Sequence, residues 1–145
     1  MTSMSQAEIE ELLDGSHQAV LSVSRDGRGP VAVPMSYLYV EGQFRIITPP
    51  DSLHGRLMQQ TGRATLTIHY EVYPDRGVLQ QYVMAEGPIE FTGDDPVPLV
   101  RALLAKDRGN SLADEWTQRM SANAATVAVL TPSSLNGYTF TDQLD

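Results

Sequence analysis

The chain has 145 residues, no cysteine, and 18 acidic against 10 basic side chains, which give a formal net charge of −8. This length suits one domain with its own core, so we expect a single domain over residues 1–145. The lack of cysteine excludes disulfides, thiolate zinc sites, iron–sulfur clusters and cysteine nucleophiles. The acidic charge disfavours nucleic acid and anionic membranes as partners. The sequence has neither a secretory leader nor a membrane-length apolar run, so we expect a cytoplasmic protein.

The first predicted element is a short helix in the segment SQAEIEELLDG, residues 5–15. Ser5 is a candidate N-cap, and Glu8 follows three positions later, as in a capping box. Gly15 lies where a helix C-terminus favours glycine. We therefore expect a helix capped at both ends.

Two strands joined by a hairpin are predicted next. Residues 18–24 alternate apolar and polar side chains, and Asp26-Gly27 is a strong signal for a short turn. Residues 30–40 continue with a period of two, but Pro34 has no amide to donate to a ladder. It indicates a sheet edge, a bulge, or a place where something other than a strand lies alongside.

A turn at 41–42 leads to a strand over 43–48, and the segment ITPPDSLHGRLMQQTG (47–62) then interrupts the β pattern. It predicts a helix of about two turns that ends at Gly62. Its apolar stripe is expected to consist of Leu53, Leu57 and Met58.

The second half of the chain is predicted from the same signals. In chain order we expect a strand over 63–71 with Ala64, Leu66, Ile68 and Tyr70 on one face, a long strand over 78–91 bent at Gly87-Pro88, helices over 97–107 and 112–120, a strand over 124–132, and a short extended tail over 135–142. Six or so antiparallel strands with short helices indicate a mainly β (α+β) fold, a small closed or split antiparallel barrel with a few peripheral helices.

The predicted helix start at Ser52 is the candidate binding site. The first amides of a helix lack intrahelical partners and, with the helix dipole, form an anion site. With Ser52 as N-cap, His54 and Arg56 fall at the second and fourth helical positions, Gly55 allows a close approach to the backbone, and Thr48 adds a hydroxyl. Cations at a helix N-terminus are unfavourable unless an anion is also present, so this pattern indicates a bound phosphate.

A simpler interpretation of the same segment involves no ligand. Ser52 could serve as a cap alone, with His54 and Arg56 in solvent. Asp51 also counts against a phosphate, because a carboxylate beside it is repulsive unless it turns away.

The order of these segments resembles the pyridoxamine 5'-phosphate oxidase-like split-barrel family of flavin-binding proteins. The matching pieces run from about residue 8 to 91, with a fainter match at AVLTPSSLNGYTF. The resemblance implies a homodimer of split barrels with an FMN-type cofactor, or the deazaflavin F420, in each groove between subunits. Carried over position by position, it implies that the isoalloxazine ring lies along Val33, Pro34, Met35 and Ser36, that the ribityl chain follows Ile47 and Thr48, and that the phosphate is held by Ser52, His54, Gly55 and Arg56.

One position departs from the family pattern, because relatives usually carry lysine where this chain has His54. Histidine has an ordinary pKa near 6.5, although a bound phosphate would raise it. Arg56 could supply the fixed charge with bidentate geometry. The substitution weakens the case for tight FMN binding and leaves F420, or loss of the cofactor, open.

Two classes of function therefore remain. The first is an FMN- or F420-dependent oxidoreductase acting on a small organic substrate. The second is a non-catalytic split-barrel protein that binds a flavin, haem or another small ligand. Oxidation of pyridoxamine phosphate is disfavoured, because Arg76 is the one basic residue between 64 and 100. No acid–base pair, nucleophile motif or metal spacing is present, and His17 and His69 are isolated in the sequence.

Overall fold

The computed structural model describes residues 1–72, 75, 77–107, 115, 119 and 124–143. These residues form three helices and nine strands. The helices are α1 (Gln6–Asp14), α2 (Leu53–Thr61) and α3 (Val97–Asp107). The strands are β1 (Thr2–Ser3), β2 (Ala19–Arg25), β3 (Arg28–Met35), β4 (Leu38–Val40), β5 (Gln43–Thr48), β6 (Arg63–Val72), β7 (Gly77–Phe91), β8 (Thr126–Leu130) and β9 (Ser134–Gln143).

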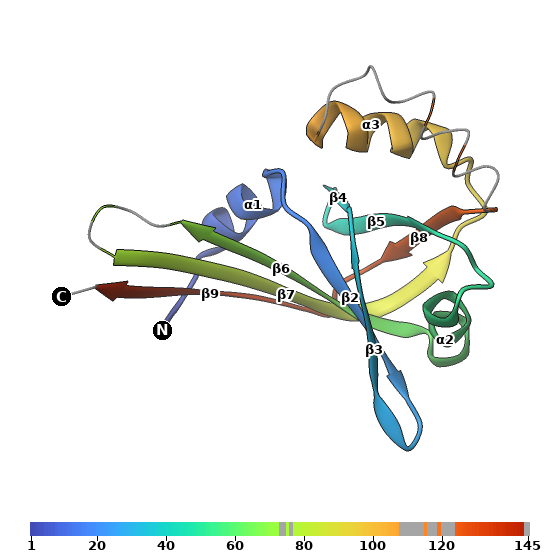
Figure 1. Cartoon of the computed structure of the whole chain (residues 1–145), viewed down its shortest axis with the longest axis horizontal. Helices are drawn as coiled ribbons and strands as arrows, with labels where there is room; N and C mark the ends of the chain where they lie inside the picture. The colour runs from blue at the N-terminus through green and yellow to red at the C-terminus, as the bar shows by residue number, and fades with distance from the viewer. Residues whose placement is uncertain (73–74, 76, 108–114, 116–118, 120–123, 144–145) are drawn as a thin grey trace.

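The strands form one open antiparallel sheet in the order β3-β2-β6-β7-β8-β5-β4, and β9 pairs with both β7 and β1. Strand β7 connects the two parts of this sheet, because it pairs with β9 as far as Glu86, with β6 as far as Pro88, and with β8 from Ile89 onward. The two ends of β7 therefore belong to two differently directed parts of the sheet (Figure 1). The fold is the antiparallel split barrel with peripheral helices that the sequence predicts.

The predicted bend at Gly87-Pro88 is confirmed, and its cause is a crossing of two backbones. A Cβ atom on Gly87 would lie 2.2 Å from the Thr131 carbonyl oxygen. On either side of this contact, the Ser133 amide donates to the Glu86 carbonyl (2.9 Å) and the Thr131 amide donates to the Pro88 carbonyl (3.0 Å). Only glycine leaves room for this approach, so Gly87 allows β7 to change partner strands.

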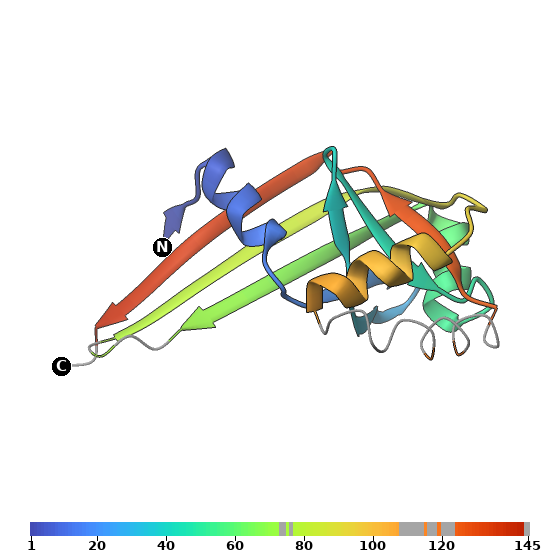
Figure 2. The same ribbon diagram turned by 90° about the horizontal axis from the view of Figure 1, so that it is seen from above.

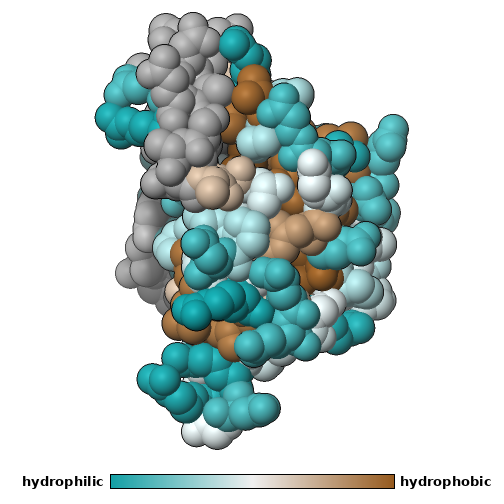
Figure 3. Space-filling model, turned by 90° about the vertical axis from the view of Figure 1, so that its right-hand side faces the viewer, coloured by the Kyte–Doolittle hydropathy of each residue, from teal (hydrophilic) through white to brown (hydrophobic). Residues whose placement is uncertain are grey.

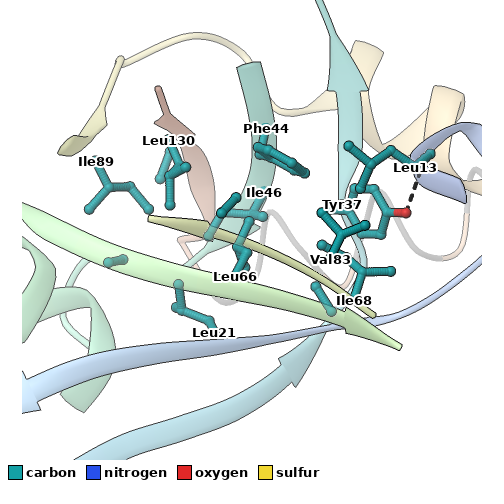
Figure 4. Close-up of a cluster of buried hydrophobic side chains, with 14 of the residues drawn as sticks. Leu13, Leu21, Tyr37, Phe44, Ile46, Leu66, Ile68, Val83, Ile89 and Leu130 are labelled. Carbon is teal, nitrogen blue, oxygen red and sulfur yellow. Dashed lines mark hydrogen bonds between the residues drawn. The ribbon is translucent and has the colours of Figure 1, made fainter. Parts of the chain in front are cut away.

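A single large core fills the inner face of the sheet (Figure 4). Helix α1 contributes Ile9, Leu12 and Leu13 to it, and Figure 2 shows α1 running alongside the long strands. Tyr37 is fully buried and donates its hydroxyl to the Leu13 carbonyl (3.0 Å). Burial of these side chains supplies most of the favourable free energy of folding.

Helix α3 covers the other side of the second part of the sheet, where it contacts β4 and β5. The buried residues Leu99 and Leu103 pack with Val127 and against Ile47, which is half-buried. This separate cluster fixes the outer surface of β5, the strand that leads to α2.

The predicted caps are confirmed. Ser5 and Glu8 form the capping box of α1, and Gly15 is its C-cap. Ser52 caps α2, and Gly62 ends it in the left-handed region at φ 68°. Local sequence chemistry therefore set the ends of these two helices.

Four expectations need correction. The strand predicted over 30–40 is two strands, β3 and β4, because the chain turns at Tyr37 to bury that ring. The tail predicted over 135–142 is part of strand β9, which pairs with β7 from Gly77 to Glu86. The sheet has nine strands rather than about six, and β1 was not anticipated. In α2 the predicted stripe is only partly buried, since Leu53 is 48% exposed.

The helix predicted over 112–120 lies outside the described residues, apart from positions 115 and 119.

Candidate functional site

The candidate site begins where β5 ends. Thr48 is the last residue of β5 and is 3% exposed, and two prolines and Asp51 then lead to Ser52. The Ser52 hydroxyl accepts a hydrogen bond from the Gly55 amide (3.1 Å) and donates one to the Pro49 carbonyl (2.7 Å). Ser52 therefore ties the helix start to the loop before it, in addition to capping the helix.

The imidazole of His54 turns toward the protein. Its Nε2 atom contacts the Thr48 hydroxyl and lies 3.3 Å from the Ser52 hydroxyl oxygen. Because the Ser52 proton is directed to Pro49, a hydrogen bond between Ser52 and His54 requires the proton on Nε2. Burial lowers the pKa of His54 below 6.5, so the ring is uncharged at neutral pH.

The position of Gly55 is determined by the loop. Gly55 is buried, and a Cβ atom on it would lie 2.4 Å from the Pro49 carbonyl oxygen and 2.8 Å from the Pro50 carbonyl oxygen. The close approach that glycine permits is thus made by the chain itself. The two prolines before the cap were the sequence signal for this packing, and their carbonyls are the site component that sequence reasoning missed.

Two amides at the start of α2 stay available to a ligand. Gly55 donates to the Ser52 side chain, and Arg56 donates to the Ser52 carbonyl (2.9 Å). The amides of Leu53 and His54 make no hydrogen bond within the described part of the chain. The first turn of α2 contains no acidic residue, and the side chains of Arg56 and Asp51 are exposed. This arrangement suits an anion approached from solvent.

The residues predicted to lie along a ring are on and just after β3. This strand ends the path of paired strands and pairs with β2, which α2 also contacts. Pro34 projects to the opposite side of β3 from Val33 and Met35, and Ser36 lies in the break before β4. Within the described residues no hydrogen bond joins these four positions to α2. The structure therefore places them one strand away from the helix start.

Ile47 and Thr48 face different sides of β5. Thr48 points inward to His54, whereas Ile47 packs beneath α3 against Leu103 and Leu104. Of the predicted residues, the structure thus gathers Thr48, Ser52, His54 and Gly55 into one cluster, with Arg56 at its exposed rim and Ile47 outside it.

The other groups considered from the sequence lie elsewhere. The His17 ring packs on the Tyr70 ring (centroids 4.8 Å apart), and His69 is exposed. The described ranges contain no group of three or more side chains able to hold a metal ion.

Two pockets near these elements do not include the helix start. The first, of about 290 Å³, borders the second half of α2 and the end of β7, and is lined by Met58, Gln59, Gly62, Ile89, Glu90, Phe91 and Ala128. The second, of about 360 Å³, is lined by Glu8, Glu11, Leu12, His17, Tyr70 and Gln81. In Figure 3, which faces the α2 end of the molecule, hydrophilic residues are interrupted by hydrophobic patches.

The structure is similar to several solved proteins at low sequence identity. A FAD-binding protein from Mesorhizobium loti aligns with a TM-score of 0.70 and 17% identity over 96% of this chain and 97% of that one. A conserved hypothetical protein from Mycobacterium tuberculosis aligns with a TM-score of 0.76 and 16% identity, over 93% of this chain and 84% of that one. A flavocytochrome from Azotobacter vinelandii aligns with a TM-score of 0.70 and 16% identity, over 97% of this chain and 70% of that one. At these identities the similarity establishes the split-barrel fold.

No protein-family model and no curated protein matches the chain. Among the described residues, no helix combines the length and the apolar character that crossing a membrane requires.

Proposed function

We propose that this protein binds a flavin-type cofactor, FMN or F420, and acts as an oxidoreductase on a small organic substrate. The observation that carries the proposal is the start of α2, where two amides have no hydrogen-bond partner among the described residues, Arg56 is exposed, and the first turn holds no acid. The split-barrel fold supports it, because similar structures include a FAD-binding protein and a flavocytochrome. FAD is accordingly a third cofactor to test.

The residues present suit the phosphate end of such a cofactor. The Leu53 and His54 amides would donate to its oxygens, and Arg56 would supply the fixed positive charge that uncharged His54 does not. The role we assign to His54 is to hold the loop through Thr48 and Ser52. Edge strand β3, with Val33–Ser36, would offer unpaired backbone to the ring.

A bound flavin or deazaflavin would supply the hydride chemistry, so the chain needs no catalytic pair of its own. Its residues would bind and orient the cofactor and exclude water. This agrees with the lack of a recognisable catalytic motif in the sequence.

The test is a spectral titration of the pure protein with FMN, FAD and F420. Saturable binding of one of them at tens of micromolar or below is expected. Arg56→Gln should weaken it by at least about tenfold, because charge-assisted hydrogen bonds to phosphate are lost. The control is Arg28→Gln, which removes an exposed arginine at the start of β3. The proposal fails if none of the three binds, or if both variants lose affinity equally.

The second candidate is a split-barrel protein that binds a cofactor without turnover. The uncharged state of His54 favours it, since the site then holds one fixed cation, Arg56. Reduction of a substrate panel by the loaded protein, faster than by free cofactor, would exclude this candidate. A haem-binding version would need an axial ligand, and three histidines are available, of which His54 already contacts Thr48 and Ser52. Without a Soret band after haem addition, that version fails.

A further inference from the structure

The pocket between the end of α2 and the end of β7 has the features of a small-molecule site. Figure 1 shows the helix beside the last part of this strand. The lining residues Met58, Ile89 and Ala128 are buried members of the core, and Phe91 adds a half-buried aromatic side chain. At about 290 Å³ the pocket lies near the lower limit for small-molecule sites, so it suits a compact ligand with an apolar surface.

The edge of β7 that borders this pocket points backbone groups toward the end of α2. On the opposite side, the Pro88 carbonyl accepts a hydrogen bond from the chain just after β8 (3.0 Å), and the Thr92 amide donates one to β8 (3.1 Å). Bonded and non-bonded pairs alternate in an antiparallel ladder, so the amides and carbonyls of Ile89 and Phe91 point away from β8. The Ile89 amide confirms this direction, because it donates to the Gly62 carbonyl (3.0 Å).

One donor and one acceptor stay unpaired on this edge. Strand β6 begins at Arg63, so the described chain offers no strand beside β7 past Ile89 on this side. Within the described residues, the Ile89 carbonyl and the Phe91 amide make no hydrogen bond. Backbone groups in such surroundings are usually paired, with protein, water or a ligand. A ligand that carries a donor next to an acceptor would pair both.

The charges around the pocket favour an uncharged ligand over an anion. No basic residue is among the described residues that line it, and the lining residue Glu90 is exposed. The C-terminal end of α2, the negative end of the helix dipole, forms one side. The Gln59 side-chain nitrogen donates to the Pro50 carbonyl (2.8 Å) and the Gly55 carbonyl (3.1 Å), which leaves its oxygen to accept from a ligand.

We infer that this pocket binds a planar aminoheterocycle of the adenine type, a flat uncharged ring with an exocyclic amine beside a ring nitrogen. The amine donates to the Ile89 carbonyl, and the ring nitrogen accepts from the Phe91 amide. The ring covers the apolar surface of the pocket. A peptide strand is disfavoured, because the free edge extends only from Ile89 to Phe91. The site adjoins the end of α2 opposite to the proposed phosphate site, so it does not rest on the proposed function.

The test is calorimetric titration of the full chain without flavin, with 9-methyladenine as the probe. Binding with a Kd below about 1 mM is expected for a ligand of this size. The ligand control is 9-methylpurine, which has the same rings without the amine. It should bind at least about tenfold more weakly, because the Ile89 carbonyl then lacks its donor.

A variant that fills the pocket tests the location. Ala128→Val adds two methyl groups at a lining residue and should weaken binding of 9-methyladenine at least about tenfold. Ala32→Val makes the same change at an exposed position of β3, outside the pocket, and should leave the affinity unchanged. Thermal unfolding of both variants checks that they are folded.

Hydrogen exchange followed by NMR needs no variant and decides the matter if Ala128→Val does not fold. The Phe91 amide should exchange faster than the Glu90 amide in the free protein and slow down when 9-methyladenine is bound. The inference is overturned if 9-methyladenine does not bind, if 9-methylpurine binds equally well, if a folded Ala128→Val binds like Ala32→Val, or if exchange at Phe91 is unchanged by the ligand. Flavin takes no part, so failure here leaves the proposed function standing, and failure of flavin binding leaves this inference standing.

Discussion

Helices α1 and α2 both begin with a serine N-cap, but the side chains in their first turns differ in charge. Each has a serine N-cap whose hydroxyl accepts from the amide three residues later, at 3.2 Å from Glu8 and 3.1 Å from Gly55. In α1 the residue at that third position is itself an acid, and the Glu8 carboxylate accepts from the Ser5 amide (3.1 Å). In α2 the third position is glycine, and the other side chains of the first turn are basic or uncharged, although the exposed Asp51 precedes the cap.

The difference distinguishes a helix start whose dipole already faces an acidic side chain of the same helix from one that can accept an anionic ligand. In α1, hydrogen bonds from the backbone and then the side chain of Ser5 lower the pKa of Glu8, so an internal anion already faces the helix dipole. In α2 no internal anion does so, and two amides have no partner within the described residues. A bound anionic ligand would take the place at α2 that the Glu8 carboxylate has at α1.

The largest effect should come from Gly55, the glycine that stands in α2 where α1 has Glu8. Gly55→Ala would bring a Cβ atom to 2.4 Å from the Pro49 carbonyl oxygen, a backbone atom that cannot rotate away. We expect a loss of about 3 kcal/mol in the free energy of unfolding, measured by urea denaturation. Gly29→Ala is the control, because nothing lies within 4 Å of its Cβ position. Equal stability of the two variants would contradict the packing described for the Pro49–Ser52 loop.

Removing the two caps compares the helix starts directly. Ser5→Ala should cost about 1 kcal/mol, the usual loss for an N-cap. Ser52→Ala should cost about 2 kcal/mol, because it also leaves the Pro49 carbonyl without its hydroxyl donor. The measurement is again chemical denaturation, with Ser52→Thr as a variant that keeps a hydroxyl. If the two alanine variants cost the same, the bond to Pro49 contributes nothing.

The two helix starts also show what could be predicted from sequence. Ser5, Glu8 and Gly15 around α1, and Ser52 and Gly62 around α2, act through contacts within one or two turns, so their residue types were sufficient. The inward turn of His54 depends on Thr48, six residues away on another element. Sequence suggested that both hydroxyls were near but could not show that the ring faces them.

Long-range pairing explains the misses in the fold. The segment LNGYTFTD resembles a tail because Asn136 and Gly137 weaken its strand signal. It is a strand because it pairs with β7, and Gly137 is needed where Met4 and Ile9 pack on it. The break at Tyr37 likewise follows from a partner far away, the Leu13 carbonyl. Neither partner is visible in the local pattern.

Giving α2 an acid of its own would make it resemble α1. Leu53→Glu places a carboxylate in the first turn of α2, at a side chain that is 48% exposed. We expect the free energy of unfolding to rise by about 0.5 kcal/mol through the helix dipole. The affinity for a phosphate-bearing cofactor should fall by at least about tenfold through repulsion. Leu53→Gln is the neutral control and should change neither quantity appreciably. If the glutamate variant loses no more affinity than the glutamine variant, the phosphate of the cofactor does not bind at this helix start.

The smallest expected effect is a difference in how the two helix starts respond to acid. Both the His54 pKa, lowered by burial, and the Glu8 pKa, lowered by hydrogen bonds from Ser5, lie below their ordinary values of 6.5 and 4.5. In each case the stabilisation is complete above the ordinary pKa and is lost as the pH falls through the lowered one. The stability difference between wild type and His54→Gln should therefore be constant above about pH 6.5 and shrink below it.

The matching difference for Glu8→Gln should persist to lower pH and shrink below about pH 4.5. Urea denaturation at a series of pH values measures both. Inorganic phosphate sharpens the comparison, because an anion that touched the imidazole would stabilise its charged form. If His54 only holds the loop through Thr48 and Ser52, added phosphate should leave the His54 profile where it is; if phosphate moves that profile upward, the imidazole is itself a ligand of the anion.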